Sequence, residues 1–211
     1  MSTKLNKKVR NLLRSKSKYY SYSYYRDKSF FMYNNIESLC GIFDNKNTVI
    51  KTEETISLTT KIHFGSNPKS VKKKLGKPSC YINKSINSLD FNIFFYKMYM
   101  GEYKTKHDIH FYEDKLYYFS YVFSYFNHSD KEFIKKIICK KYLNQECELN
   151  NSTITDKYGN TLFITDNVDF TINYLTGDSE IQKKFNTIQK KTIKNRTKLL
   201  EKNQVELLNK L

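Results

Sequence analysis

The sequence predicts an α+β fold built from two helix-β-β-β units with antiparallel sheets, plus a basic helix at each end. Three observations support this fold class. Aromatic residues make up 16% of the 211 residues, so most of the chain has enough apolar surface to fold. Only 2 Pro and 6 Gly interrupt it, which favours long regular elements. Helix-capping residues alternate with runs typical of strands. The α+β domain is expected over 31–177, with tandem units at 55–126 and 129–177.

Residues 1–30 are expected to form a separate basic, Tyr-rich arm. They hold nine Lys or Arg and one acid, Asp27, and so carry +8 of the chain's formal charge of +16. Helical spacing of apolar residues predicts a short basic helix over 1–18. A cluster of this kind suits phosphate or anionic lipid, although solubility alone would also explain it. The candidate binding residues are Lys4, Lys7, Lys8, Arg10, Arg14, Tyr19 and Tyr22.

The first unit opens with a strand and a short, well-delimited helix. Alternating apolar residues predict a strand over 55–64. Asn67 is a favourable N-cap and Pro68 suits the first helical position. Gly76 favours a left-handed C-terminal position, and Pro78 prevents continuation. A helix of about two turns is therefore expected between these residues.

Three strands are expected after this helix, at 89–100, 109–113 and 116–126, with a turn region at 101–108. The last strand carries an aromatic stripe that would project to one face. The stripe comprises Tyr117, Phe119, Tyr121, Phe123 and Tyr125. Such a stripe is compatible with a platform for nucleic-acid bases, but a core position beneath a helix is favoured.

The second unit is predicted to start with a helix at Ser129, where Ser129 and Glu132 fit a capping box. Its apolar face would contain Phe133, Ile134, Ile137, Ile138 and Tyr142. Strands are expected at 152–156, 160–165 and 169–175, separated by turn residues.

Residues 178–211 are expected to form a basic helical tail. One apolar patch lies near its start and a leucine-rich patch near its end, with mostly polar residues between them. The pattern is compatible with a packed helix, a short coiled coil or a docking helix.

The stretch 65–78 resembles the helix opening of the SmpA/OmlA family, which has a layout like the β-lactamase-inhibitor-protein fold. The shared positions are Gly65, Val71, Leu75, Gly76 and Pro78. Residues 109–116 are similar to a later hairpin of that family, and the likeness covers roughly 62–126. The resemblance implies a small non-enzymatic protein that binds other proteins. Many family members are exported lipoproteins, but this chain shows neither an export signal nor a lipid-attachment Cys near its start. No functional residue is carried over.

The sequence shows no motif for catalysis, a metal or a cofactor, so no enzyme activity is expected. There is no Gly-rich phosphate loop and no nucleophile elbow. His107 and His110 would face opposite sides of a strand and would not share a metal. Asp156, Asp166 and Asp169 lie in predicted turns and are compatible with a cluster in space, although turn formation explains each one.

A cytoplasmic location is expected. No apolar run is long enough to span a membrane, and no secretory signal is present. The 4 Cys lack C-x-x-C spacing and are too sparse for a disulfide framework. Because the first 26 residues contain Lys and Arg but no acid, organellar import is a minor alternative.

Two functions are compatible with these features. The first is a non-enzymatic protein-interaction or structural module that offers a sheet face, a sheet edge or its terminal helices to a protein partner. The second is a nucleic-acid-associated protein that binds phosphate through its basic N-terminal arm. A catalytic site assembled from residues far apart in the sequence would show no motif and would fit neither function. The sequence fixes neither the partner nor the oligomeric state.

Overall fold

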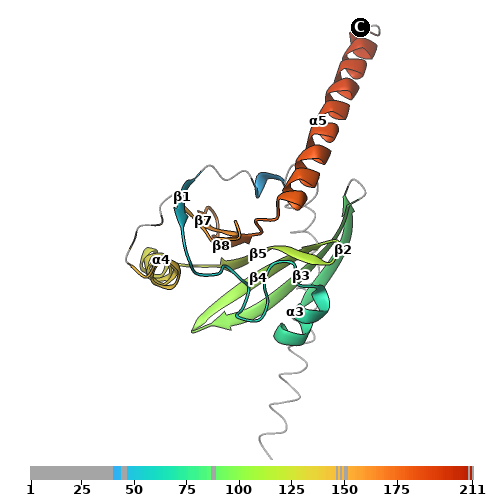
Figure 1. Cartoon of the computed structure of the whole chain (residues 1–211). Helices are drawn as coiled ribbons and strands as arrows, with labels where there is room; N and C mark the ends of the chain where they lie inside the picture. Colours follow the sequence, from blue (N-terminus) through green and yellow to red (C-terminus); the bar gives the residue numbers. More distant parts are fainter. Residues whose placement is uncertain are drawn as a thin grey trace, which may run out of the picture.

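The computed structural model describes residues 40–43, 47–86, 89–145, 147, 149, 152–208 and 210. Figure 1 shows one broad sheet with helices beside it and a long helix that points away from it. In chain order, the elements are β1 (Thr48–Lys51), α3 (Pro68–Leu75), β2 (Cys80–Ile86), β3 (Leu89–Met100), β4 (Tyr103–Tyr112), β5 (Lys115–Phe123), α4 (His128–Leu143), β6 (Ser152–Thr155), β7 (Thr161–Asp166), β8 (Phe170–Leu175) and α5 (Ser179–Leu208).

The strands form one mixed sheet, not the two separate antiparallel sheets that the sequence predicts. Its eight strands have the order β1-β6-β7-β8-β5-β4-β3-β2. β5 and β8 pair antiparallel over six residues, from Tyr118 opposite Leu175 to Phe123 opposite Phe170. β1 pairs parallel with β6 at one edge. The fold is thus mixed α/β and mostly sheet, and the β5–β8 pair joins the two strand runs.

The first strand run has four strands after α3, where three were expected. β2 was not predicted, and it pairs with β3 over its full length. β4 begins at Tyr103, so the connection from β3 is only Gly101 and Glu102. The polar residues of 103–108 resemble a turn in sequence. In β4 they pair with β3 on one side and, from Thr105 on, with β5 on the other, which is why the strand continues through them.

The strand expected at 55–64 is absent. The chain instead reverses at an isolated bridge between Thr59 and Ile62, where the Leu58 amide donates to the Ile62 carbonyl oxygen. Ile56, Leu58 and Ile62 are nevertheless buried. The alternating apolar residues of 55–64 are therefore the buried side chains of a segment that folds back on itself, and they do not form a strand.

A β-bulge breaks the aromatic stripe of β5. The register shifts after His110, so that His110 is opposite Tyr118 while Phe111 is opposite Leu116. Tyr117 is therefore an extra residue, and it joins Tyr118 on one face of the sheet. Phe119, Tyr121 and Phe123 lie buried on the other face, whereas Tyr125 is fully exposed. The middle of the stripe is core, and the stacking platform for bases is not formed.

Each sheet face has its own apolar core. On the first face, Phe119, Tyr121 and Phe123 pack with α4, α3 and the 56–62 segment. On the second face, Phe91, Tyr112 and Tyr117 pack with residues 40–43 and the first turns of α5. On the first face, the ring of Phe119 on β5 stacks on the ring of Tyr174 on β8, with 4.3 Å between the ring centroids.

The helix caps follow local sequence in α3 and depart from the prediction in α4. In α3, the Asn67 side chain accepts a hydrogen bond from the Ser70 amide at 2.9 Å, and Gly76 has φ of +81°. The N-cap of α4 lies two residues before the predicted one, because Asn127 and Asp130 form the capping box in place of Ser129 and Glu132. The expected apolar face of α4 is only partly buried, since Phe133 and Ile137 are exposed.

α5 is attached to the body at one end only. Ile181 and Phe185 are buried in the second core, and Ile188 packs against it. Beyond them the helix extends away from the sheet (Figure 1). The predicted C-terminal helix is confirmed.

Among the described residues, no helix is both long and apolar enough to cross a membrane.

We expect Phe185→Ala to lower the free energy of unfolding by about 3–5 kcal/mol, because a buried aromatic side chain is lost. The Phe185 ring is unexposed and contacts the rings of Phe43, Phe91, Tyr112 and Tyr117. Urea denaturation provides the measurement. Leu200→Ala, on the exposed part of α5, is the control and should change stability by less than about 0.5 kcal/mol. Equal effects of the two substitutions would contradict the attachment of α5 through its first turns.

Candidate functional site

The candidate residues of the basic arm cannot be placed in the fold. Lys4, Lys7, Lys8, Arg10, Arg14, Tyr19 and Tyr22 all lie outside the described residues. A role for them in binding phosphate stays a prediction.

The two histidines of β4 lie on opposite faces of the sheet, as their spacing predicts. The His107 ring contacts Tyr121 in the first core, and its Nε2 lies 2.8 Å from the Thr105 hydroxyl. The His110 ring contacts Tyr117 and Tyr118 on the second face. Burial lowers the pKa of His107 to about 4, so this imidazole is neutral at ordinary pH. The pair does not form a metal site.

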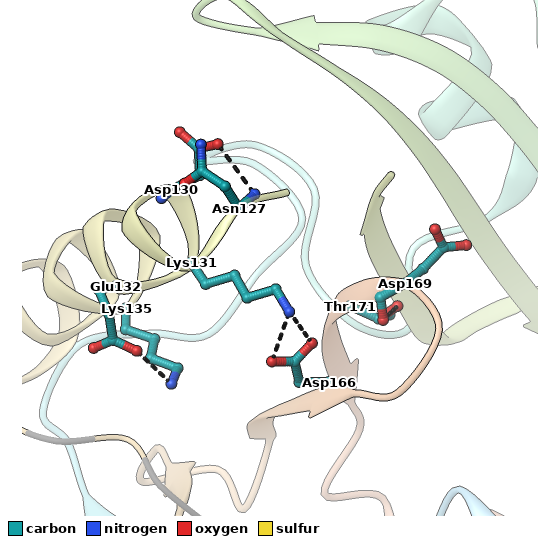
Figure 2. Close-up of polar contacts among 8 residues, drawn as sticks. All are labelled: Asn127, Asp130, Lys131, Glu132, Lys135, Asp166, Asp169 and Thr171. Atoms are coloured by element: carbon teal, nitrogen blue, oxygen red, sulfur yellow. Dashed lines mark hydrogen bonds and ion pairs between the residues drawn. The ribbon is translucent and has the colours of Figure 1, made fainter. Parts of the chain in front are cut away.

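The three turn aspartates do not cluster. Lys131 on α4 holds Asp166 through both carboxylate oxygens, at 2.8 and 3.1 Å. In Figure 2 the Asp169 carboxylate points away from this pair. Asp156 lies in a different corner of the fold, described below. No three His, Cys, Asp or Glu side chains gather as a metal site anywhere in the part of the chain that the structure describes.

The surface around the Lys131–Asp166 pair contains a cleft of about 340 Å³ whose charges are locally matched. It lies between the end of β5, the start of α4 and the 166–169 turn, as Figure 2 shows in part. Lys106, on its wall, donates to the Ser124 hydroxyl at 3.3 Å. Asp169 supplies a carboxylate on the same wall. The lining thus contains two lysines and one aspartate, and Lys131 is paired with Asp166.

Cys139 and Cys147 form a disulfide, which the sparse cysteine spacing did not predict. The bond connects the last turns of α4 to the loop that leads to β6. Cys40 and Cys80 are buried. Since disulfides persist mainly in oxidising compartments, the cysteine pattern is no argument for a reducing compartment.

The Asp156 side chain organises the turn between β6 and β7. It is buried, and its carboxylate accepts three backbone hydrogen bonds, from the amides of Ile56, Tyr158 and Asn160, each at 2.9 Å. The Asn160 side-chain amide donates a fourth at 3.0 Å. The Asn160 side-chain oxygen then accepts from the Gly177 amide at 3.0 Å. One carboxylate therefore connects three segments that are far apart in sequence.

Gly177 allows the 156–160 turn to lie directly against the start of α5. A Cβ atom at Gly177 would come within 2.4 Å of the Tyr158 carbonyl oxygen and of the Gly159 carbonyl carbon. No side chain fits there without moving backbone. This close approach brings Tyr158 beside the residues that begin α5.

Between these segments lies a cleft of about 560 Å³, here called the α5-base cleft. Its volume is in the range of small-molecule sites. Phe64 and the exposed Tyr158 provide aromatic rings, and Asp178 provides a carboxylate. The complete lining is Thr55, Ile56, His63, Phe64, Gly65, Tyr158, Asn160, Thr176, Gly177 and Asp178. Asp178 also caps α5, because its Oδ1 accepts from the Glu180 amide at 2.9 Å.

The outer part of α5 presents an amphipathic surface. Ile193, Leu200 and Leu207 are seven residues apart and share one side of the helix, and each is about half exposed. Lys191, Lys194 and Lys198 lie on the opposite side. Residues 189–208 contain six Lys or Arg and two Glu. This surface therefore combines an apolar stripe with a net positive charge.

Comparison of the chain with protein-family models, with curated proteins and with solved structures finds no significant match.

Sequence reasoning missed the α5-base cleft because its walls come from three separate segments. The turn residues Asp156, Gly159 and Asn160 were recognisable as a turn. Their contact with Gly177 and Ile56 depends on tertiary structure. The Tyr158 ring gave no distinguishing pattern in the sequence.

We expect Asp156→Ala to lower the free energy of unfolding by about 3 kcal/mol or more, because three backbone amides, of which that of Ile56 is buried, lose their acceptor. Chemical denaturation measures this change. Asp90→Ala, which removes an exposed carboxylate from β3, is the matched control and should have little effect. A loss below about 1 kcal/mol for Asp156→Ala would show that the carboxylate does not organise the corner.

The low pKa of His107 predicts a pH dependence of stability. The unfolded chain takes up a proton at this imidazole near pH 6.5, whereas the folded protein does so only near pH 4. Stability from His107 is thus complete above pH 6.5 and falls as the pH decreases towards 4, by about 3 kcal/mol in total. His107→Gln should remove this part of the slope. The difference between wild type and variant, measured by denaturation from pH 7 to 4, isolates it from the carboxylates. A constant difference would refute the prediction.

Proposed function

We propose that the protein is a non-enzymatic interaction module that binds a protein partner through the outer part of α5. The observation that carries the proposal is the exposed stripe of Ile193, Leu200 and Leu207 on a helix whose first turns alone are anchored. Amphipathic helices of this kind dock by placing anchors at i and i+7 in an apolar groove. The helix would bind as a preformed element, with little ordering cost.

The chemistry of the partner follows from the charges on α5. A net charge of +4 over residues 189–208 favours a groove whose rim is acidic. Pairing with a second copy is disfavoured, because Arg196 and Asn203 occupy the positions that a coiled coil fills with apolar residues. Two such helices would also repel each other. An acidic-rimmed apolar groove on another protein is therefore the proposed partner surface.

Nucleic-acid association is the second candidate. The N-terminal residues 1–30 carry a net +8, and phosphate contacts of Lys and Arg would account for affinity. In that case the lysines of α5 add electrostatic attraction, while its apolar stripe has no role. Protein docking thus depends mainly on the apolar stripe of α5, whereas nucleic-acid association depends on its lysines.

Two matched triple variants separate these functions. We expect Ile193→Ser/Leu200→Ser/Leu207→Ser to weaken protein binding at least about 100-fold, because buried anchors at a helix–groove interface contribute about 1–2 kcal/mol or more each. Lys191→Gln/Lys194→Gln/Lys198→Gln should weaken it less and reduce its salt dependence. The partner is first captured from native cells on the full chain at moderate salt and identified by mass spectrometry. Affinities for the purified partner are then measured.

Circular dichroism and urea denaturation serve as controls, and both variants should match wild type because the substituted side chains are exposed. Nucleic-acid binding predicts the reverse ranking, with RNA or DNA affinity lost in the lysine variant, lost on deletion of residues 1–28, and strongly reduced by salt. Loss of partner binding in the lysine variant alone would contradict docking through the stripe.

A further inference from the structure

The α5-base cleft differs in charge from the rest of this basic protein. Lys and Arg account for 37 of the 211 residues, so ten residues drawn at random would include about two. The ten lining residues include neither, and Asp178 is the only carboxylate among them. Phosphate ligands and nucleic acid need cationic or donor-rich surfaces. The lining therefore supplies no Lys or Arg side chain to pair with an anion.

The aromatic walls of the cleft suit a positive charge. Phe64 and Tyr158 both line it, and Tyr158 is 63% exposed. Faces of aromatic rings attract ammonium groups through their quadrupole. The Tyr158 ring already makes one such cation–π contact, with the Nζ of Lys157 at 5.3 Å from the ring centroid. Lys157 does not line the cleft.

The start of α5 does not cancel this preference. An α-helix carries an effective charge of roughly +0.5 at its N-terminus. Asp178 contributes a full negative charge at the same place, and its Oδ1 accepts hydrogen bonds from the Glu180 and Ile181 amides. The Asp178 carboxylate therefore offsets the positive end of the helix.

We propose that the α5-base cleft binds an organic ammonium group between the Asp178 carboxylate and the rings of Phe64 and Tyr158. Its volume of about 560 Å³ accommodates the ammonium group together with the chain that carries it. Recognition of such cations by aromatic rings and a carboxylate is an established mode of binding. The site is independent of partner docking through the outer part of α5.

The walls of this site are held in place before any ligand binds. The Asp156 carboxylate fixes the amides of Ile56, Tyr158 and Asn160. Gly177 allows the Tyr158 turn to contact the start of α5 without an intervening side chain. A prearranged site loses less free energy on binding than one that must be ordered. The backbones of Tyr158 and Asp178 consequently keep their relative positions.

The test compares choline with its neutral isostere 3,3-dimethyl-1-butanol, using isothermal titration calorimetry on the full chain. The proposal expects choline to bind at least about tenfold more tightly, because cation–π attraction acts only on the charged ligand. Equal affinities, or no choline binding at tens of millimolar, would overturn it.

Substitutions in the site locate the binding. Asp178→Asn keeps a capping oxygen and removes the charge, so choline affinity should fall about fivefold or more. Tyr158→Phe should bind as wild type, whereas Tyr158→Leu, which keeps apolar bulk and loses the ring, should bind about fivefold more weakly. Unchanged affinity in Asp178→Asn and Tyr158→Leu would place the choline elsewhere and refute the site. Unchanged thermal unfolding of the variants shows that they remain folded.

A second arm identifies the source of the ammonium group. A short peptide with one trimethyllysine is compared with the same peptide carrying norleucine. Tighter binding of the trimethyllysine peptide than of free choline assigns the cleft to a side-chain ammonium, and the opposite ranking assigns it to a free small molecule. If choline binds no better than its neutral isostere, the proposal fails whatever the peptides show. Because the outer stripe of α5 is intact in all these variants, failure here leaves the docking function untouched.

Discussion

The fold depends on the antiparallel pairing of β5 with β8. This pairing spans Tyr118 to Phe123 on β5, and it is the contact at which the strand run after α3 meets the run after α4. Each run by itself would leave one of its strands as an open edge, with unpaired backbone donors and acceptors. Joined, they place β5 and β8 in the middle of an eight-stranded sheet, where both faces are covered.

Two cores follow from this central position. β5 is buried along nearly its whole length, so its two faces must each find apolar neighbours. The bulge at Tyr117 makes this arrangement fit, because it turns two consecutive tyrosines towards the second face while Phe119 starts the alternation of the first. Aromatic rings fill both layers, which explains why a chain without Trp reaches an aromatic content of 16%. The anchoring of α5 through Phe185 is a consequence of the second layer.

The sequence predicted the helices and strands that are determined by nearby residues, such as caps, turns and alternating apolar residues. The caps Asn67 and Gly76 delimit α3, and alternating residues with turn signals place β6, β7 and β8 close to their observed bounds. Strands that form by pairing between distant segments carry no such local pattern in the sequence. β1 and β2 become strands by hydrogen bonding to β6 and β3, and the polar start of β4 is stable only between two neighbouring strands.

The candidate site was less predictable than the fold for the same reason. The turn residues around Asp156 were visible, but a carboxylate that joins β6, the segment after β1 and the start of α5 requires all three to be in place. On α5, the sequence indicated a leucine-rich patch near the end of the helix, but it placed Ile193 in the polar stretch before that patch and did not join it to Leu200 and Leu207. Only the structure distinguishes the buried first turns of the helix from its exposed remainder.

α5 acts geometrically as a lever whose pivot is the second core. From Asp178 to Leu207 a helix rises about 43 Å, so a small molecule in the α5-base cleft cannot touch anything held near the far end. The two locations can influence each other only through the direction in which the rod points. From Phe185 in the second core to Leu207 the helix rises about 33 Å, so a tilt of about 10° at this pivot would displace its far end by about 6 Å. Small rearrangements around Phe185 and Gly177 would therefore be magnified at the tip.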